Sequence, residues 1–303
     1  MNEPRLGKPT AVLKTPWKKA GNLKFRTGDG LMSIRLVANA RMYAVSEAAR
    51  TAWQSIFAWV SDRSDVPLTV IDYPPPSPLA DRWHRPNLGV VFMCGWPFTR
   101  ARPQPWLLAA PVPLPERYGD KAVYFSDLVV HRDSSFQTLE DTFQGTVGWT
   151  LTDSNSGFNL LRHHLLQYRS AQRPRLYSRS IGQLVNPLGA LQAVAERVVD
   201  VAPVDSFCHD LFKACRHPYT SCTRTIATTA PSPIPALIAS ADVPGTIAER
   251  LSAALVTAHH DPQIVPSLQA ALIKRFDRPE AESYLYTESL AHAAETANYP
   301  VPT

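Results

Sequence analysis

Short apolar runs that are typical of β-strands alternate with segments of helical period along almost the whole chain. The strand-like runs lie at 33–38, 68–71, 90–93, 107–112, 124–130, 146–151, 198–205 and 225–229. Alternation of this kind is typical of α/β proteins, in which helices connect the strands and cover the sheet. We therefore predict mainly parallel sheets with helices on both faces.

The length of the chain, 303 residues, suits two domains or one two-lobed unit. Two long extended passages, 124–130 and 225–239, are expected to cross between two lobes. We expect residues 32–126 and 226–303 to form the first lobe and residues 127–225 to form the second. The two crossing strands would then act as a hinge.

The net charge of +5 is concentrated in residues 1–31, which hold seven Lys or Arg and only two acidic residues. This segment has no apolar period, so we predict a disordered basic tail. The remainder of the chain has equal numbers of basic and acidic residues. A neutral body argues against nucleic-acid binding outside the tail.

Residues 1–31 also lack the apolar stretch and the small-residue cleavage site of a secretory signal. The chain as written is therefore expected in the cytoplasm. Met32 could also be the true start. The protein would be periplasmic if its true N-terminus differs from the one written. No apolar run approaches the roughly 18 residues that a membrane helix needs, so we expect no membrane insertion.

One strand-to-helix junction is well suited to hold an anion. The strand-like run at 146–151 leads into Thr-Asp-Ser-Asn-Ser-Gly at 152–157, and apolar residues then recur at helical spacing. The unpaired N–H groups and the dipole at a helix start favour a small oxyanion. Ser154, Asn155 and Ser156 are thus candidate ligand contacts. The alternative is that Ser154 or Ser156 merely caps the helix.

Two further positions could face a ligand. Trp96 directly follows the buried strand 90–93 and Cys94-Gly95, where open α/β sheets place ligand contacts. It can equally be an ordinary packing residue. Asp205 ends the strand-like run 198–205. It can cap the helix that follows, or it can meet a cationic part of a ligand, since it would repel a bare anion.

The sequence offers little for catalysis or metal binding. It has no GxxxxGK[ST], GxSxG, HExxH or GxGxxG motif. The four cysteines have no CxxC spacing or suitably spaced histidine. The histidine pairs 163–164 and 259–260 occupy adjacent helical positions, which point about 100° apart. We therefore expect a protein that is not an enzyme and needs no cofactor or metal.

Several of these motifs occur together in a fixed order: the first strand with Tyr43, Cys94-Gly95-Trp96-Pro97, the crossing strand 124–130, the loop 152–157 and the strand 199–205. In this order they resemble the phosphate/phosphite/phosphonate-type substrate-binding proteins of ABC transporters, over about residues 32–262. That family is a branch of the type II periplasmic-binding-protein fold. The resemblance implies two lobes that close on a small anionic or polar ligand. It assigns ligand contacts to Tyr43, Trp96, Ser154, Asn155, Ser156 and Asp205.

The resemblance further implies a monomer that captures a phosphate- or phosphonate-like oxyanion, with an ABC permease as its partner. Two other functions are compatible with the same cleft. One is a cytoplasmic ligand-sensing or regulatory module. The other is an enzyme related to the pyrimidine-precursor proteins of thiamine biosynthesis, although their cysteine-rich motif is missing.

Overall fold

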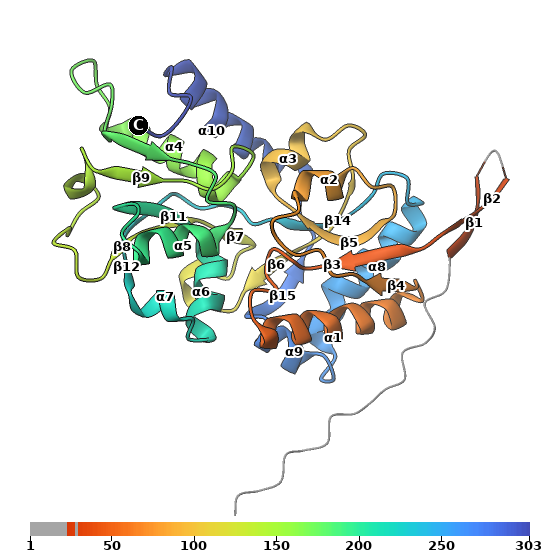
Figure 1. Ribbon diagram of the computed structural model, residues 1–303. Helices are drawn as coiled ribbons and strands as arrows, with labels where there is room; N and C mark the ends of the chain where they lie inside the picture. The colour runs from red at the N-terminus through yellow and green to blue at the C-terminus, as the bar shows by residue number, and fades with distance from the viewer. Residues whose placement is uncertain (1–22, 28–29) are drawn as a thin grey trace, which may run out of the picture.

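The structure is a computed structural model that describes residues 23–27 and 30–303. Two separate sheets, each flanked by helices, form the two halves of the molecule (Figure 1). The first sheet has the strand order β15-β6-β14-β5-β3-β4. Its strands are β3 (Leu36–Asn39), β4 (Leu68–Val70), β5 (Leu88–Met93), β6 (Trp106–Pro113), β14 (Ala236–Ala239) and β15 (Ile273–Asp277).

Helices of the first half pack around this sheet. Helix α1 contacts both α8 and α9, and α8 also packs on β6 and β15. The apolar stripe of α1, which includes Trp53, Ile56 and Phe57, is buried against the strands. The helical elements of this half are α1 (Glu47–Ser64), α2 (Leu79–Trp83), α3 (Gly95–Arg100), η1 (Glu116–Tyr118), α8 (Gly245–Thr257), η5 (Ala258–His260), α9 (Val265–Ala270) and η6 (Ala281–Tyr284).

The second sheet has the order β10-β9-β11-β8-β12. Its strands are β8 (Ser126–His131), β9 (Thr146–Gly148), β10 (Arg179–Ile181), β11 (Val201–Asp205) and β12 (Thr223–Thr228). The helical elements around it are η2 (Glu140–Thr142), the continuous run η3 (Asn155–Asn159), α4 (Leu160–Leu165) and η4 (Leu166–Tyr168), and then α5 (Pro187–Ala195), α6 (Ser206–Ala214) and α7 (Pro218–Ser221).

Both sheets are mixed, which corrects the prediction of mainly parallel sheets. The pairs β3–β4, β3–β5, β9–β10 and β9–β11 are parallel, whereas β8, β12, β14 and β15 pair antiparallel with their neighbours. The reason lies in the two connections between the halves. After β6 the chain leaves the first sheet and enters the second sheet at β8. After β12 it leaves the second sheet and returns to the first at β14. Each sheet therefore contains strands that run in opposite directions.

The two crossing passages meet between the sheets. Residues of β7 (Val123–Tyr124) pair antiparallel with those of β13 (Ser232–Pro233), with Ser232 opposite Tyr124. Both passages lie within or beside the segments predicted to cross. This short ribbon joins the halves where a hinge is expected.

The N-terminal part of the described chain forms regular structure that the sequence did not predict. Strands β1 (Leu23–Thr27) and β2 (Gly30–Ile34) form an antiparallel hairpin, whereas the sequence predicted no regular structure up to residue 31. The rest of the predicted tail lies outside the described residues.

At the C-terminal end of the chain, α10 (Leu285–Thr296) packs on α3 of the first half and on α4 of the second (Figure 1). The boundaries of the two lobes therefore stay a prediction.

Candidate ligand-binding cleft

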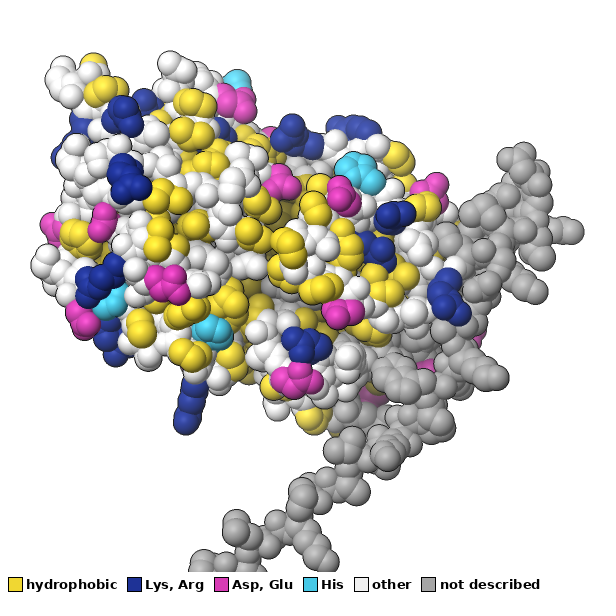
Figure 2. Space-filling model, in the orientation of Figure 1, with side chains coloured by type: hydrophobic (Ala, Val, Ile, Leu, Met, Phe, Trp, Pro, Cys, Tyr) yellow, Lys and Arg dark blue, Asp and Glu magenta, His cyan; other side chains and the backbone are white. Residues whose placement is uncertain are grey.

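A cavity of about 410 Å³ lies between the two halves and is lined by both. In Figure 2, hydrophobic side chains gather along the region where the two halves meet. The first half contributes the loop after β3 and Cys94 after β5, and the second half contributes the loop before η3 and the end of β11. The lining includes Arg41, Tyr43, Cys94, Thr150, Asp153, Ser154, Ser156, Gly157 and Asp205.

The topology of the first sheet explains why a cavity forms there. The chain runs from β3 to β4 on one side and then returns to β5 on the other side of β3, with all three strands parallel. Such a reversal of strand order opens a crevice at the carboxyl ends of the strands. Tyr43 follows β3 and Cys94 follows β5, so both lie at this crevice.

Ser154 both caps the helix and lines the cavity. Its hydroxyl accepts a hydrogen bond from the Gly157 N–H at 3.0 Å, which is N-cap geometry. Ser156 lies in the first turn and also faces the cavity. The two alternatives that the sequence left open for Ser154 are thus compatible. The helix start, with its orphan N–H groups, adjoins the cavity as predicted.

Gly157 allows an unusually close contact with Thr150. A Cβ atom at residue 157 would lie 1.8 Å from the Thr150 hydroxyl oxygen and 2.8 Å from its Cβ. The backbone N–H of Thr150 donates to the Gly157 carbonyl at 3.1 Å. The Thr150 hydroxyl is buried, lines the cavity and has no hydrogen-bond partner among the described residues. Sequence reasoning missed Thr150, because inside a strand-like run nothing distinguishes it from a core residue.

Asn155 has a different position from its two neighbours. Its side chain is fully buried and does not line the cavity. Its amide N–H groups donate to the Tyr124 hydroxyl at 3.0 Å and to the Ser232 hydroxyl at 3.1 Å, and its oxygen accepts from Asn159 at 3.1 Å. Since Tyr124 and Ser232 are partners in the β7–β13 ribbon, Asn155 connects the loop to the hinge. This role replaces the predicted side-chain contact with a ligand.

Tyr43 presents a neutral hydroxyl to the cavity. Its ring packs edge-on against Phe92 and Phe207, with ring centroids 4.9 and 4.8 Å apart. Burial, reinforced by Asp205, raises the pKa of the Tyr43 hydroxyl well above its usual value. The hydroxyl oxygen lies 3.5 Å from an Asp205 carboxylate oxygen. Tyr43 is thus a rigid hydrogen-bonding group on the wall formed by the first half.

Asp205 caps α6 and lines the cavity at the same time. One carboxylate oxygen accepts hydrogen bonds from the N–H groups of Phe207 and Cys208, at 2.9 and 3.0 Å. Burial raises the pKa of Asp205 to about 7, although these two amides oppose the shift. Near neutral pH the side chain therefore exists in both protonation states.

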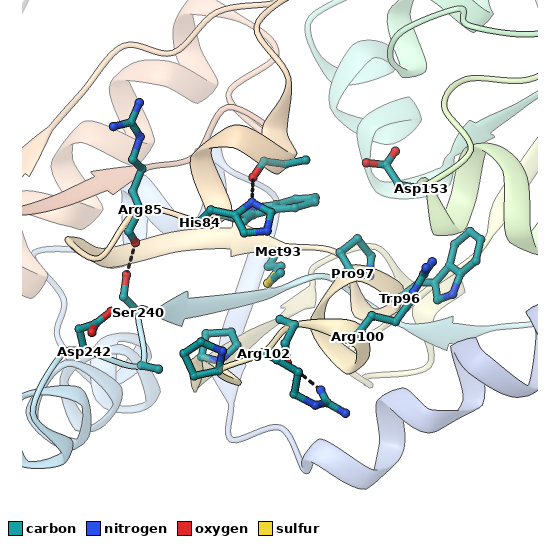
Figure 3. Close-up of a pocket in the computed structure, with 16 residues that line it drawn as sticks. His84, Arg85, Met93, Trp96, Pro97, Arg100, Arg102, Asp153, Ser240 and Asp242 are labelled. Atoms are coloured by element: carbon teal, nitrogen blue, oxygen red, sulfur yellow. Dashed lines mark hydrogen bonds between the residues drawn. The ribbon is translucent and has the colours of Figure 1, made fainter.

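Trp96 lies beside a second cavity instead of the first. This cavity, of about 580 Å³, is lined by Trp96, Arg100, His84 and Asp242 among others (Figure 3). The two cavities share Trp83 and Asp153 in their walls, so they are neighbours. We call residues 154–157 the serine loop. Trp96 does not line the cavity beside this loop, contrary to the prediction that places all contacts around one ligand.

Among the described residues, no cluster of three or more His, Cys, Asp or Glu side chains has an arrangement that could bind a metal ion. No helix within the described part of the chain combines the length and the apolar character required to span a bilayer.

Two sheets of mixed direction, a paired crossing ribbon and a cavity between the halves define a solute-binding protein of the periplasmic-binding-protein fold. Residues 43–284 match the family described as "ABC transporter, phosphonate, periplasmic substrate-binding protein", and the chain belongs to this family. The predicted family and fold are confirmed. Members of the family are periplasmic substrate-binding components of transporters, so the chain is not an enzyme.

Solved structures show the same fold. A binding protein component of an ABC phosphonate transporter from Pseudomonas aeruginosa has 14% identity and a TM-score of 0.71, over 87% of this chain and 88% of that one. PhnD1 from Prochlorococcus marinus, in complex with methylphosphonate, has 15% identity and a TM-score of 0.70, over 86% and 98%.

A more distant structure binds another oxyanion class. The periplasmic aliphatic sulphonate binding protein SsuA from Escherichia coli has 14% identity and a TM-score of 0.52, over 88% of both chains. The comparison with curated proteins found no match.

Proposed function

We propose that the cleft captures a small organophosphonate-like oxyanion and that the protein delivers it to an ABC permease. The observation that carries the proposal is the loop 154–157, whose serines and helix start face the cavity. Oriented N–H and O–H dipoles at a helix start are suited to a compact anion. Membership of the phosphonate-binding family and the methylphosphonate bound to the Prochlorococcus relative support this ligand class.

The proposed contacts come from both halves. Ser154, Ser156 and Thr150 supply hydroxyl groups from the second half, and Tyr43 supplies one from the first. Arg41 is a half-buried cation in the cavity wall, and its guanidinium also donates to the Ser77 carbonyl. The unpartnered Thr150 hydroxyl gains a partner when an oxyanion binds, which recovers the cost of its desolvation.

The charges of the wall limit the ligand further. Two carboxylates, Asp153 and Asp205, line the cavity together with Arg41. A fully ionised phosphonate beside Asp205 would be repelled unless one partner carries a proton or the ligand has its own cation. We therefore favour a monoanionic or zwitterionic ligand over a dianionic one.

We also propose the assembly and the motion. The lobes 32–126 with 226–303, and 127–225, would close on the ligand about the β7–β13 ribbon. We propose a monomer that docks on its permease in the periplasm; the family's description as a periplasmic component of an ABC transporter supports the location. The cytoplasmic location expected from the sequence as written is set aside in favour of the periplasm.

Ligand-induced thermal stabilisation and isothermal titration calorimetry test the proposal. Methylphosphonate, 2-aminoethylphosphonate, methanesulfonate and inorganic phosphate form the panel. A ligand present at 100 times its Kd stabilises by about 2.7 kcal/mol, or a rise in Tm of roughly 5 °C. We expect such a shift with at least one phosphonate.

The double variant Ser154→Ala with Ser156→Ala should lose this shift, and Ser289→Ala on the exposed face of α10 is the matched control. Because Ser154 is an N-cap, its loss also lowers the Tm of the free protein, so each variant is compared with its own ligand-free state. An undiminished ligand-induced rise in Tm in the double variant would contradict the proposed anion site at residues 154–157, which we call the seat.

A further inference from the structure

The second cavity continues the cleft beyond Asp153. Trp83 and Asp153 stand in the walls of both cavities, so a group bound at the serine loop has Asp153 between it and the second cavity. The second cavity is the roomier of the two, at about 580 Å³ against about 410 Å³. A ligand as small as methylphosphonate leaves this space unused.

Asp153 and Arg100 approach this cavity from opposite halves of the molecule. Asp153 lies in the turn before η3, and Arg100 is the last residue of α3. In Figure 3 Asp153 lies on the second half, across the cavity from Trp96 and Arg100 of the first half. Within the described part of the chain, neither side chain has an ion pair. Two opposite charges thus border one cavity without neutralising each other.

The surroundings hold both groups ready for a ligand. The Arg100 guanidinium lies over the Trp96 ring, 5.5 Å from its centroid, which fixes the cation while leaving its N–H groups available. Asp153 is half-buried, and this burial raises the pKa of its carboxyl. A desolvated carboxylate without a cation favours a ligand that brings one.

The other cations of the cavity are less suited to this task. Arg102 donates to the carbonyls of Thr99 and Ala101, at 2.8 and 2.7 Å. Arg85 extends away from Trp96 and Asp153 in Figure 3. Asp242 adds an acidic group to the wall near Ser240, on the side of the cavity away from Trp96 (Figure 3). Among the arginines of this cavity wall, Arg100 is therefore the one on the Trp96 side for which no hydrogen bond within the protein is found among the described residues.

We propose that the second cavity recognises the amino-acid end of a phosphono α-amino acid, with the ligand ammonium at Asp153 and the ligand carboxylate at Arg100. An amino-acid group carries both charges on one carbon, which suits a cavity whose wall holds side chains of opposite sign on its two sides. The phosphonate of the same molecule occupies the seat at 154–157, so the inference rests on the proposed function. The ligand class is a short phosphono amino acid, and 2-amino-3-phosphonopropionate is the probe.

A matched pair of ligands isolates the new contact. 2-Aminoethylphosphonate has the phosphonate and the amine of the probe and lacks only its carboxylate. A charge-assisted hydrogen bond contributes about 1.5–3 kcal/mol, so the probe should bind at least about tenfold more tightly. Equal affinity of the two ligands, measured by calorimetry, overturns the inference while leaving the phosphonate seat in place.

Variants assign the contact to its residues. Arg100→Gln should reduce the affinity for the probe to that for 2-aminoethylphosphonate and leave the latter unchanged. Arg85→Gln changes an exposed arginine of the same cavity wall and should alter neither affinity. Asp153→Asn should weaken both amine-bearing ligands and should not lower the affinity for methylphosphonate, since it removes a negative charge beside the phosphonate. If Arg100→Gln weakens both amine-bearing ligands equally, or Arg85→Gln has the same effect as Arg100→Gln, the assignment is wrong.

The outcome for methylphosphonate separates the two proposals. If methylphosphonate and both amine-bearing ligands fail to bind, the proposed function itself has failed. If methylphosphonate binds and the carboxylate brings no gain, only the recognition of the amino-acid end has failed.

Discussion

Two strand-to-helix junctions of the second half face the same cleft, and they treat their helix starts in opposite ways. At the first junction the cap is the neutral Ser154, which satisfies one N–H. At the second junction the cap is Asp205, which satisfies two N–H groups with its own carboxylate. A helix start can therefore attract an anion or be occupied by the protein's own anion, and the cap residue decides which.

Converting the first junction into the second should give the largest effect. Asp and Ser are comparable N-caps, so Ser154→Asp retains the cap and the fold, with a change in Tm within a few degrees. The added carboxylate occupies the anion seat and repels the ligand. We expect phosphonate affinity to fall by more than about 100-fold, a loss of roughly 2.7 kcal/mol, in calorimetry. Retained binding in Ser154→Asp would contradict the role of this helix start.

Gly157→Ala tests the close packing of Gly157 against Thr150 at the first junction. The new Cβ would overlap the Thr150 side chain, and overpacking of this kind costs about 1–3 kcal/mol. Unfolding by denaturant should show that loss, and ligand affinity should fall with it. Because all three close contacts are to the Thr150 side chain, adding Thr150→Gly should recover most of the stability. No recovery in the double variant would mean that the backbone, and not this contact, is strained.

Asn155→Ala separates the hinge from the seat. The substitution leaves the hydroxyls of Tyr124 and Ser232 and the amide of Asn159 with fewer partners, at a cost of about 1–3 kcal/mol. Chemical denaturation should report this loss. Thr152→Ala, at an exposed position of the same turn, is the control. A variant as stable as the control would contradict the role of Asn155 as a connection to the hinge.

The second junction predicts a smaller, pH-dependent effect. Since the pKa of Asp205 is raised to about 7 in the folded protein, its contribution to stability is fully present below about pH 4 and is lost as pH rises through 7. Asp205→Asn retains a capping side chain and does not titrate. The Tm of the variant relative to that of the unmodified protein should therefore increase from pH 4 to pH 8. A constant difference would mean that Asp205 ionises at an ordinary pKa.

The sequence predicts the family, the two-lobed fold and the helix start at the cleft, and it does so through local patterns. The sequence pattern does not predict strand direction, because the direction of β8, β12, β14 and β15 depends on where the chain crosses between the halves. Residues 265–277 divide into α9 and β15, with Leu272 in the left-handed region at φ 55° between them. A leucine gives no local signal for such a stop.

Within the candidate site, the sequence could name the loop but could not orient its side chains. Ser154 and Ser156 face the cavity, while Asn155 between them points to the hinge, because neighbouring residues of a helical turn point in different directions. Thr150 and Asp153 acquire their roles only from tertiary contacts with Gly157 and with the second cavity.

Helix α10 has a mechanical consequence. Its buried residues Leu290, Ala291 and Ala294 belong to a helix that touches both α3 and α4. Any separation of those two elements would expose part of this apolar surface to water, at a cost of roughly 25 cal/mol for each Å² uncovered. Helix α10 thus holds the two halves together on the side of α3 and α4. A rotation that opens the cleft has its greatest freedom on the opposite side of the molecule.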